Sequence, residues 1–126
     1  MASLPLNDGA AIMSGVNTRR AMPVQTFSVL VFDMAHTGQP DGERTVDGFA
    51  SLDAARAYAE ARVRSSVEEL RAANRSAAEL RRLWHIFGED CTVLGGAFSC
   101  RDHLDRYIAE PAGPAEIDWP SLAPKR

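Results

Sequence analysis

The segment over residues 26–75 constrains the fold more than any other part of the chain, because it joins three patterns without a break. A short apolar run comes first, a turn-rich polar stretch follows, and a long amphipathic helical pattern completes the segment. The run over residues 27–34 is rich in β-branched and aromatic side chains, which predicts a strand. Since both of its faces are largely apolar, we expect a central strand that helices cover on at least one side.

A second strand and two helices are predicted next. Residues 43–49 alternate in a way that suits an edge strand with one wet face. Ser51 is a suitable N-cap for the first helix, and Asp53 places negative charge at its positive end. Residues at helical spacing form its predicted buried stripe: Leu52, Ala55, Ala59, Val63, Val67 and Leu70. Four charged residues of alternating sign mark a predicted solvent face: Arg56, Glu60, Arg64 and Glu68.

The second helix is predicted to begin at a capping box formed by Ser76 and Glu79, and to end at Gly88. Its predicted apolar face consists of Leu80, Leu83, Trp84 and Phe87. A third strand is expected over residues 92–94 and a last helix over residues 99–109. The predicted fold is therefore α+β: a small, mostly antiparallel three-stranded sheet, packed on one face by two or three helices.

The chain has 126 residues, which suits a single domain. We expect a flexible N-terminal arm over residues 1–24, because this segment lacks any steady apolar period. The α+β domain then spans residues 25–110. Residues 111–126 contain four prolines, and we expect an extended tail that Trp119 partly docks against the domain.

Composition argues against several classes of protein. The net charge of −3 makes a nucleic-acid partner unlikely on electrostatic grounds, because phosphate contacts need clustered positive charge. No apolar stretch is long enough to cross a membrane, so no membrane partner is expected. Two cysteines without an export signal suit a reducing cytoplasm. No motif has the strength of a P-loop or a paired Cys-x-x-Cys, so no cofactor is predicted.

Three residues near the end of the first strand form the candidate catalytic set: Asp33, His36 and Asp41. A carboxylate beside an imidazole can act as a general base or hold a divalent metal ion. The alternative is a solvated polar turn, because Asp, His and Gly are common in exposed hairpins. The spacing of these residues identifies neither a catalytic nucleophile nor a third metal ligand.

A second candidate set has the residue types that zinc prefers: His85, Cys91, Cys100 and His103. Cys100 and His103 are three residues apart and can share one helix face. The spacing of a zinc ribbon or finger is absent, so the alternative interpretation is ordinary buried cysteines and a surface histidine. A Cys91–Cys100 disulfide is less expected still in a reducing compartment.

The third candidate set combines two acids after a helix with a cluster of arginines. Glu89 and Asp90 follow a predicted helix C-terminus, where the helix dipole disfavours acids. We expect them to need arginine partners, local N–H donors or a function, and Arg44, Arg81 or Arg82 could supply the first of these. The arginine cluster of this set is Arg71, Arg75, Arg81 and Arg82. Contact with an acidic protein surface or pairing inside the molecule are the two interpretations.

These observations leave three hypotheses from different classes. The leading one is a non-catalytic cytoplasmic association module that binds itself or another protein, with a homodimer through the sheet edge or the first helix. The second is a small enzyme or ligand-binding domain with its site at Asp33 and His36. A pocket that holds such side chains within hydrogen-bond reach would favour it. The third is a zinc-stabilised domain.

Overall fold

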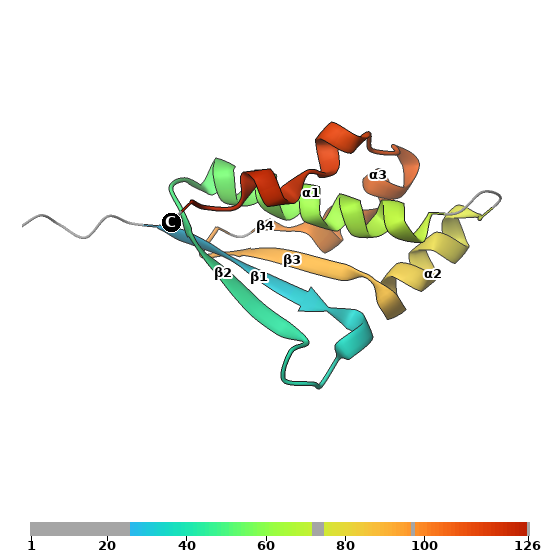
Figure 1. Cartoon of the computed structure of the whole chain (residues 1–126). Coiled ribbons are helices and arrows are strands. Elements are labelled where there is room, and N and C mark those ends of the chain that lie inside the picture. Colours follow the sequence, from blue (N-terminus) through green and yellow to red (C-terminus); the bar gives the residue numbers. More distant parts are fainter. Residues whose placement is uncertain (1–25, 72–74, 97, 126) are drawn as a thin grey trace, which may run out of the picture.

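The computed structural model describes residues 26–71, 75–96 and 98–125, so the arm predicted over residues 1–24 lies outside the described residues (Figure 1). The strands are β1 (Phe27–Asp33), β2 (Glu43–Phe49), β3 (Glu89–Leu94) and β4 (Phe98–Ser99). The α-helices are α1 (Leu52–Leu70), α2 (Ala77–Phe87) and α3 (Leu104–Ala109). Short 3-10 helices are η1 (Met34–His36), η2 (Cys100–His103), η3 (Pro114–Ile117) and η4 (Trp119–Leu122).

The four strands form one antiparallel sheet in the order β2-β1-β3-β4. The predicted α+β class and the central place of β1 are confirmed. The predicted count of three strands is wrong, because β4 pairs with β3 across a turn that contains Gly95 at a φ of 74°. β4 has only two residues, which is too short for an alternating pattern in the sequence.

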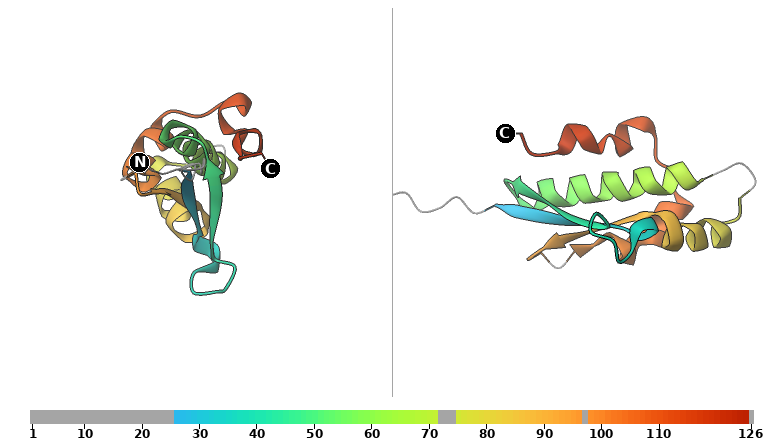
Figure 2. Two further views of the ribbon diagram at one scale, coloured as in Figure 1. Left: turned by 90° about the vertical axis from the view of Figure 1, so that its left-hand side faces the viewer. Right: turned by 60° about the horizontal axis from the view of Figure 1, so that its bottom comes forward.

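The register of the sheet decides which side chains meet α1. Val29 lies opposite Val93 and Val31 lies opposite Cys91, and all four are buried. Opposite residues in an antiparallel pair share one face of the sheet, so these four form its inner face. In the right-hand view of Figure 2 the strands lie in front of α1, which covers only that inner face.

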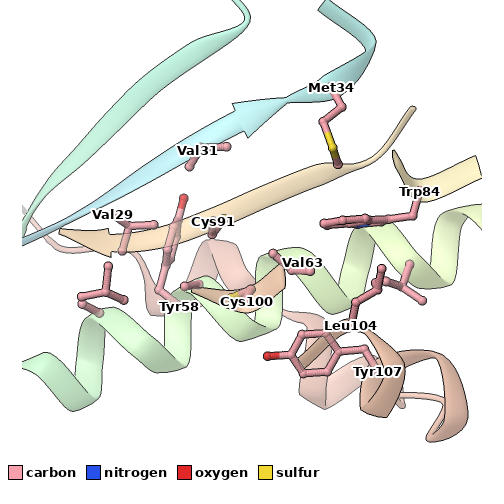
Figure 3. Packing of buried hydrophobic residues seen from close by; sticks show 14 of the residues in the cluster. Val29, Val31, Met34, Tyr58, Val63, Trp84, Cys91, Cys100, Leu104 and Tyr107 are labelled. Carbon is pink, nitrogen blue, oxygen red and sulfur yellow. The ribbon is translucent and has the colours of Figure 1, made fainter. Parts of the chain in front are cut away.

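The first helix begins where the sequence predicts, with the Ser51 hydroxyl accepting a hydrogen bond from the Ala54 N–H at 3.0 Å. Its predicted stripe is buried from Ala55 to Val67, whereas Leu52 is 41% exposed. A second buried row runs beside that stripe at four-residue spacing and consists of Tyr58, Arg62 and Ser66. Figure 3 shows Tyr58 and Val63 among the core side chains of the sheet and α3.

The charged ladder of α1 faces solvent as predicted only at Arg56, because α3 and the C-terminal segment pack on the other three residues, Glu60, Arg64 and Glu68. Glu60 accepts hydrogen bonds from the Tyr107 hydroxyl at 2.6 Å and from Arg106 at 2.9 Å. Burial alone would raise the pKa of Glu60, but these two hydrogen bonds and the charges of Arg56 and Arg106 together lower it. Arg64 donates to the Glu110 carbonyl at 2.8 Å. These charged residues therefore hold α3 and the C-terminal segment against α1. The sequence pattern alone could not indicate this role.

The C-terminal segment forms η3 and η4 along the side of α1 away from the sheet (Figure 1). The Trp119 ring lies edge-on to the Tyr58 ring, with 5.9 Å between centroids. On its face the guanidinium of Arg62 lies 4.0 Å from the ring centroid. The helix α1 is consequently a middle layer between the sheet and this segment.

The second helix has the predicted capping box. The Glu79 N–H donates to the Ser76 hydroxyl at 3.1 Å, and the Ser76 N–H donates to the Glu79 carboxylate at 3.2 Å. Leu80 and Trp84 are buried as expected, but Phe87 is 56% exposed. Phe87 is the last residue of α2, and Gly88 leads the chain directly into β3. The Phe87 ring therefore lies beyond the edge of the core.

A polar pocket at the ends of β1 and β3

A pocket of about 360 Å³ opens where β1 ends and β3 begins, and we call it the end pocket. Asp33 and Glu89 lie opposite each other in the sheet, and both line the end pocket. The lining residues come from β1, η1, α1, α2, β3 and η4: Asp33, Ala35, His36, Arg62, Ser65, Ser66, Glu69, Phe87, Glu89 and Trp119. A smaller hollow of about 40 Å³ shares Asp33 and Glu89 and adds Asp41 and Arg44.

Asp33 and His36 form a hydrogen-bonded pair on one side of the end pocket. One carboxylate oxygen of Asp33 accepts the Ala35 N–H at 3.0 Å and so caps η1. The other lies 2.8 Å from His36 Nδ1. This hydrogen bond, then the charge of Asp33 and that of Asp41, raise the pKa of His36. The structure thus brings two of the candidate catalytic residues together, with the third close enough to act through its charge.

Arg62 and Glu89 form a second, more buried pair. Arg62 is 4% exposed, and its Nε and Nη2 donate to the two Glu89 oxygens at 2.9 and 3.3 Å. Its Nη1 donates to the Tyr58 hydroxyl at 2.6 Å. Burial alone would lower the pKa of Arg62, but its hydrogen bonds to Glu89 and Tyr58 raise it. The Ser66 hydroxyl also accepts the Glu89 N–H at 2.9 Å, so Glu89 is held from two turns of α1.

Sequence reasoning did not assign Arg62 to this site and proposed the wrong partners for Glu89. An arginine beside the predicted buried stripe of α1 is a signal for a buried ion pair, because such a charge needs a partner. Tyr58 and Ser66 flank it at four-residue spacing, which could have marked a polar row on the inner side of the helix. The identity of the carboxylate depends on tertiary structure, since Arg62 and Glu89 are 27 residues apart.

The other candidate acid lies outside the end pocket. Asp90 is 7% exposed, and Arg101 approaches its carboxylate at 3.3 Å. Its carboxylate also accepts the Cys91 N–H at 2.9 Å. Burial raises the pKa of Asp90 in spite of the Arg101 charge. The predicted partners Arg44, Arg81 and Arg82 are again not the ones that the structure shows.

The arginine cluster is tied mainly to its own fold. Arg71 donates to the Glu68 carboxylate at 2.8 and 3.0 Å and to the Tyr107 and Ile108 carbonyls at 3.1 Å. It therefore satisfies carbonyls near the end of α3. Arg75 donates to the Leu70 carbonyl, Arg81 pairs with Asp105, and Arg82 is exposed on α2. None of these four arginines lines the end pocket.

The structure does not unite the candidate zinc ligands. His85 is exposed beside Trp84, and His103 stacks on Phe98 with 5.1 Å between ring centroids. Cys91 and Cys100 are buried free thiols, and burial raises the pKa of Cys91 to about 12 and that of Cys100 further. Across residues 26–71, 75–96 and 98–125, no group of three or more His, Cys, Asp or Glu side chains could hold a metal ion.

In the described part of the chain, no helix has both the length and the apolar character needed to cross a membrane. Comparisons with protein-family models, with curated proteins and with solved structures found no significant match to this chain.

Proposed function

We propose that this domain binds a small, positively charged ligand in the end pocket. The observation that carries this proposal is a concave site in which the pair Asp33–His36 and the pair Arg62–Glu89 are fixed by hydrogen bonds. A volume of about 360 Å³ lies within the range of small-molecule sites, which is roughly 300–1,000 Å³. Side chains that are already held lose little freedom when a ligand arrives, which favours binding.

The charge of the lining favours a cation. Arg62 and Glu89 neutralise each other, and protonated His36 can at most neutralise Asp33. Glu69 adds a further carboxylate, so the lining carries a net charge of −1 or, with neutral His36, −2. An ammonium group would find Coulomb attraction here, whereas an anion would be repelled.

Aromatic side chains add a second reason to expect a cation. Phe87 is 56% exposed and lines the pocket from the last position of α2. Trp119 supplies a second ring, one face of which is occupied by Arg62. Aromatic faces attract organic cations, with a gain of about 0.5–2 kcal/mol. A carboxylate together with an exposed ring is the combination that recognises an alkylammonium group.

Binding fits the geometry better than catalysis does. His36 hydrogen bonds to Asp33, and within the described residues no hydroxyl or thiol nucleophile is bonded to its ring. Two nearby hydroxyls have other partners, since Ser66 accepts the Glu89 N–H and Thr37 donates to the Met34 carbonyl. The pair Asp33–His36 is therefore proposed to orient the ligand and to set the charge of the site.

The proposal is tested by thermal unfolding with alkylammonium, guanidinium, neutral and anionic small molecules of matched size. We expect only cations to raise the melting temperature, by several degrees at saturating concentration, since a ligand at 100 times its Kd stabilises by about 2.7 kcal/mol. Glu69→Gln should weaken the effect, and Glu79→Gln on the capping box of α2 serves as a control away from the pocket. Equal responses to cations and anions, or no response to any, would contradict the proposal.

A second candidate function is self-association through the outer face of the sheet. Leu30 and Phe32 are only half-buried there, and Leu94 is 41% exposed. The alternative routes are less open, because the sheet and the C-terminal segment cover α1, and charged residues and a bulge mark the β2 edge. Sedimentation of the wild type and of Leu94→Lys tests it: a dimer that the variant dissociates supports the idea, and a monomer throughout the micromolar range excludes it.

A further inference from the structure

The two cysteines are neighbours across the β3–β4 hairpin. The ladder pairs Val93 with Phe98 and Thr92 with Ser99 and ends there, so Cys91 and Cys100 are the residues that adjoin its last pair. Alternation along β3 directs Cys91 to the inner face, and Cys100, at the start of η2, is buried in the same hydrophobic core. Neighbouring strands lie about 4.8 Å apart, and a disulfide spans Cα atoms that are about 4.4–6.8 Å apart.

The surroundings of the two thiols are shared and dry. Cys91 is 1% exposed and Cys100 is 0% exposed, and Figure 3 shows both between the sheet and the helices. The buried Tyr107 belongs to the same core, and its hydroxyl donates to Glu60 at 2.6 Å. Glu60 is 24% exposed, so this hydrogen bond links the core around the thiols to the surface.

We propose that Cys91 and Cys100 are a reversible disulfide pair, with a small-molecule disulfide such as oxidised glutathione as the oxidant. One cysteine, as thiolate, attacks a sulfur of the oxidant and releases one glutathione thiolate. The other cysteine, as thiolate, then attacks the protein sulfur of the mixed disulfide, and the second glutathione leaves. The protein loses two protons and two electrons, and one glutathione disulfide becomes two glutathione thiols.

The position of the pair also determines how fast it reacts. Both thiols are buried and their pKa values are raised, so little thiolate exists in the closed structure at neutral pH. Access requires the hairpin to open, and β4 is a two-residue edge strand held by few ladder contacts. Such an edge is the kind of segment that opens locally without unfolding the rest. Oxidation of the native protein should therefore be slower than that of the unfolded chain, although it is more favourable.

Equilibrium with glutathione redox buffers tests the proposal on the full chain. Native and urea-unfolded samples are equilibrated from both the reduced and the oxidised side, quenched with acid and assayed by mass for the loss of two hydrogens. We expect the equilibrium constant for the intramolecular disulfide to be roughly 30- to 700-fold higher in the native protein. An equal or lower constant in the native protein would overturn the proposal.

Hairpin opening can be too slow for the native protein to reach redox equilibrium. In that case the ratio of the two equilibrium constants follows from the difference between the free energies of unfolding of the oxidised and reduced forms, measured in urea. An oxidised form that resists urea better supports the pair, and one that resists it less overturns it. Cys100→Ala is the matched control, because it leaves Cys91 alone. Its mixed disulfide with glutathione should form far less readily in the native than in the unfolded state. Equal formation would show that Cys91 is not enclosed in this way and would count against the proposal.

Discussion

At the scale of single residues, Arg62 connects the core of the molecule to its candidate site. Its guanidinium has hydrogen bonds to Glu89 and Tyr58 and lies on the ring of Trp119. Because these partners come from α1, β3 and η4, one side chain fixes three elements around the end pocket. A buried charge with full partners is tolerated, whereas one that loses its partner is costly.

Glu89→Gln is expected to lower the free energy of unfolding by about 3 kcal/mol, because it leaves Arg62 charged and nearly buried without its carboxylate. Urea denaturation at neutral pH measures the change. The control is Glu110→Gln, an exposed site where the effect should stay within about 0.5 kcal/mol. A loss at residue 89 no larger than the control would show that the pair contributes little.

The pKa of His36 should lie above its ordinary value of about 6.5, because Asp33 and Asp41 favour the charged ring. NMR titration of the ring protons measures it, and Asp33→Asn should bring it down. Since the folded-state pKa is raised, the stabilisation from this pair is full below the unfolded-state pKa of about 6.5. It is lost as the pH rises through the folded-state pKa. A His36 pKa at its ordinary value in the wild type would contradict the hydrogen-bonded pair with Asp33.

Single residues also show why the candidate site was only partly predictable. Asp33 and His36 are three positions apart at a strand end, so the sequence alone places them together. Glu89 and Arg62 are brought together by the crossing of α1 over β3, which no local pattern encodes. The exposed ring of Phe87 was missed for the same reason, since helical spacing does not show where the core ends.

At the scale of elements, local signals were reliable where an element is long or capped. The apolar run of β1, the cap of α1 and the capping box of α2 all appear in the structure. The ladder of α1 was misassigned, because an amphipathic pattern does not reveal which later segment covers the polar face. Element β4 could not be predicted, since its two residues acquire strand geometry only by pairing with β3.

Ser76→Ala is expected to lower the free energy of unfolding by about 1 kcal/mol, because the Glu79 N–H loses its side-chain acceptor. Thermal and urea unfolding measure the effect. Ser99→Ala is the comparison, since Ser99 precedes η2 without forming a side-chain cap. A loss at Ser76 that merely equals the loss at Ser99 would mean that the box does not stabilise α2.

At the scale of the whole molecule, the C-terminal segment turns a two-layer fold into a three-layer one. It covers the side of α1 that the sheet leaves open, and it carries Trp119 to the end pocket (Figure 1). Hydrogen bonds from Arg64 and to Glu68 fasten the chain on the way, at Glu110 and Ala112. The C-terminal segment therefore contributes both to the stability of the fold and to the shape of the end pocket.

Trp119→Ala should lower the free energy of unfolding by about 2 kcal/mol, through the loss of apolar contact with Tyr58 and of the cation–π contact with Arg62. It should also weaken cation binding, because Trp119 lines the end pocket. Leu122→Ala on the same segment is the control, since Leu122 is 43% exposed. Equal effects of the two substitutions would mean that Trp119 is not the anchor.

Binding of an organic cation in the end pocket is tested most directly by NMR. A short alkyl diamine and its neutral diol analogue are titrated into the nitrogen-15-labelled protein. The account predicts saturable shifts from the diamine alone, centred on the amides of Ala35, His36, Ser65, Glu69 and Phe87. No saturable shift with the diamine, or shifts centred instead on Leu30 and Leu94 of the outer sheet face, would contradict it.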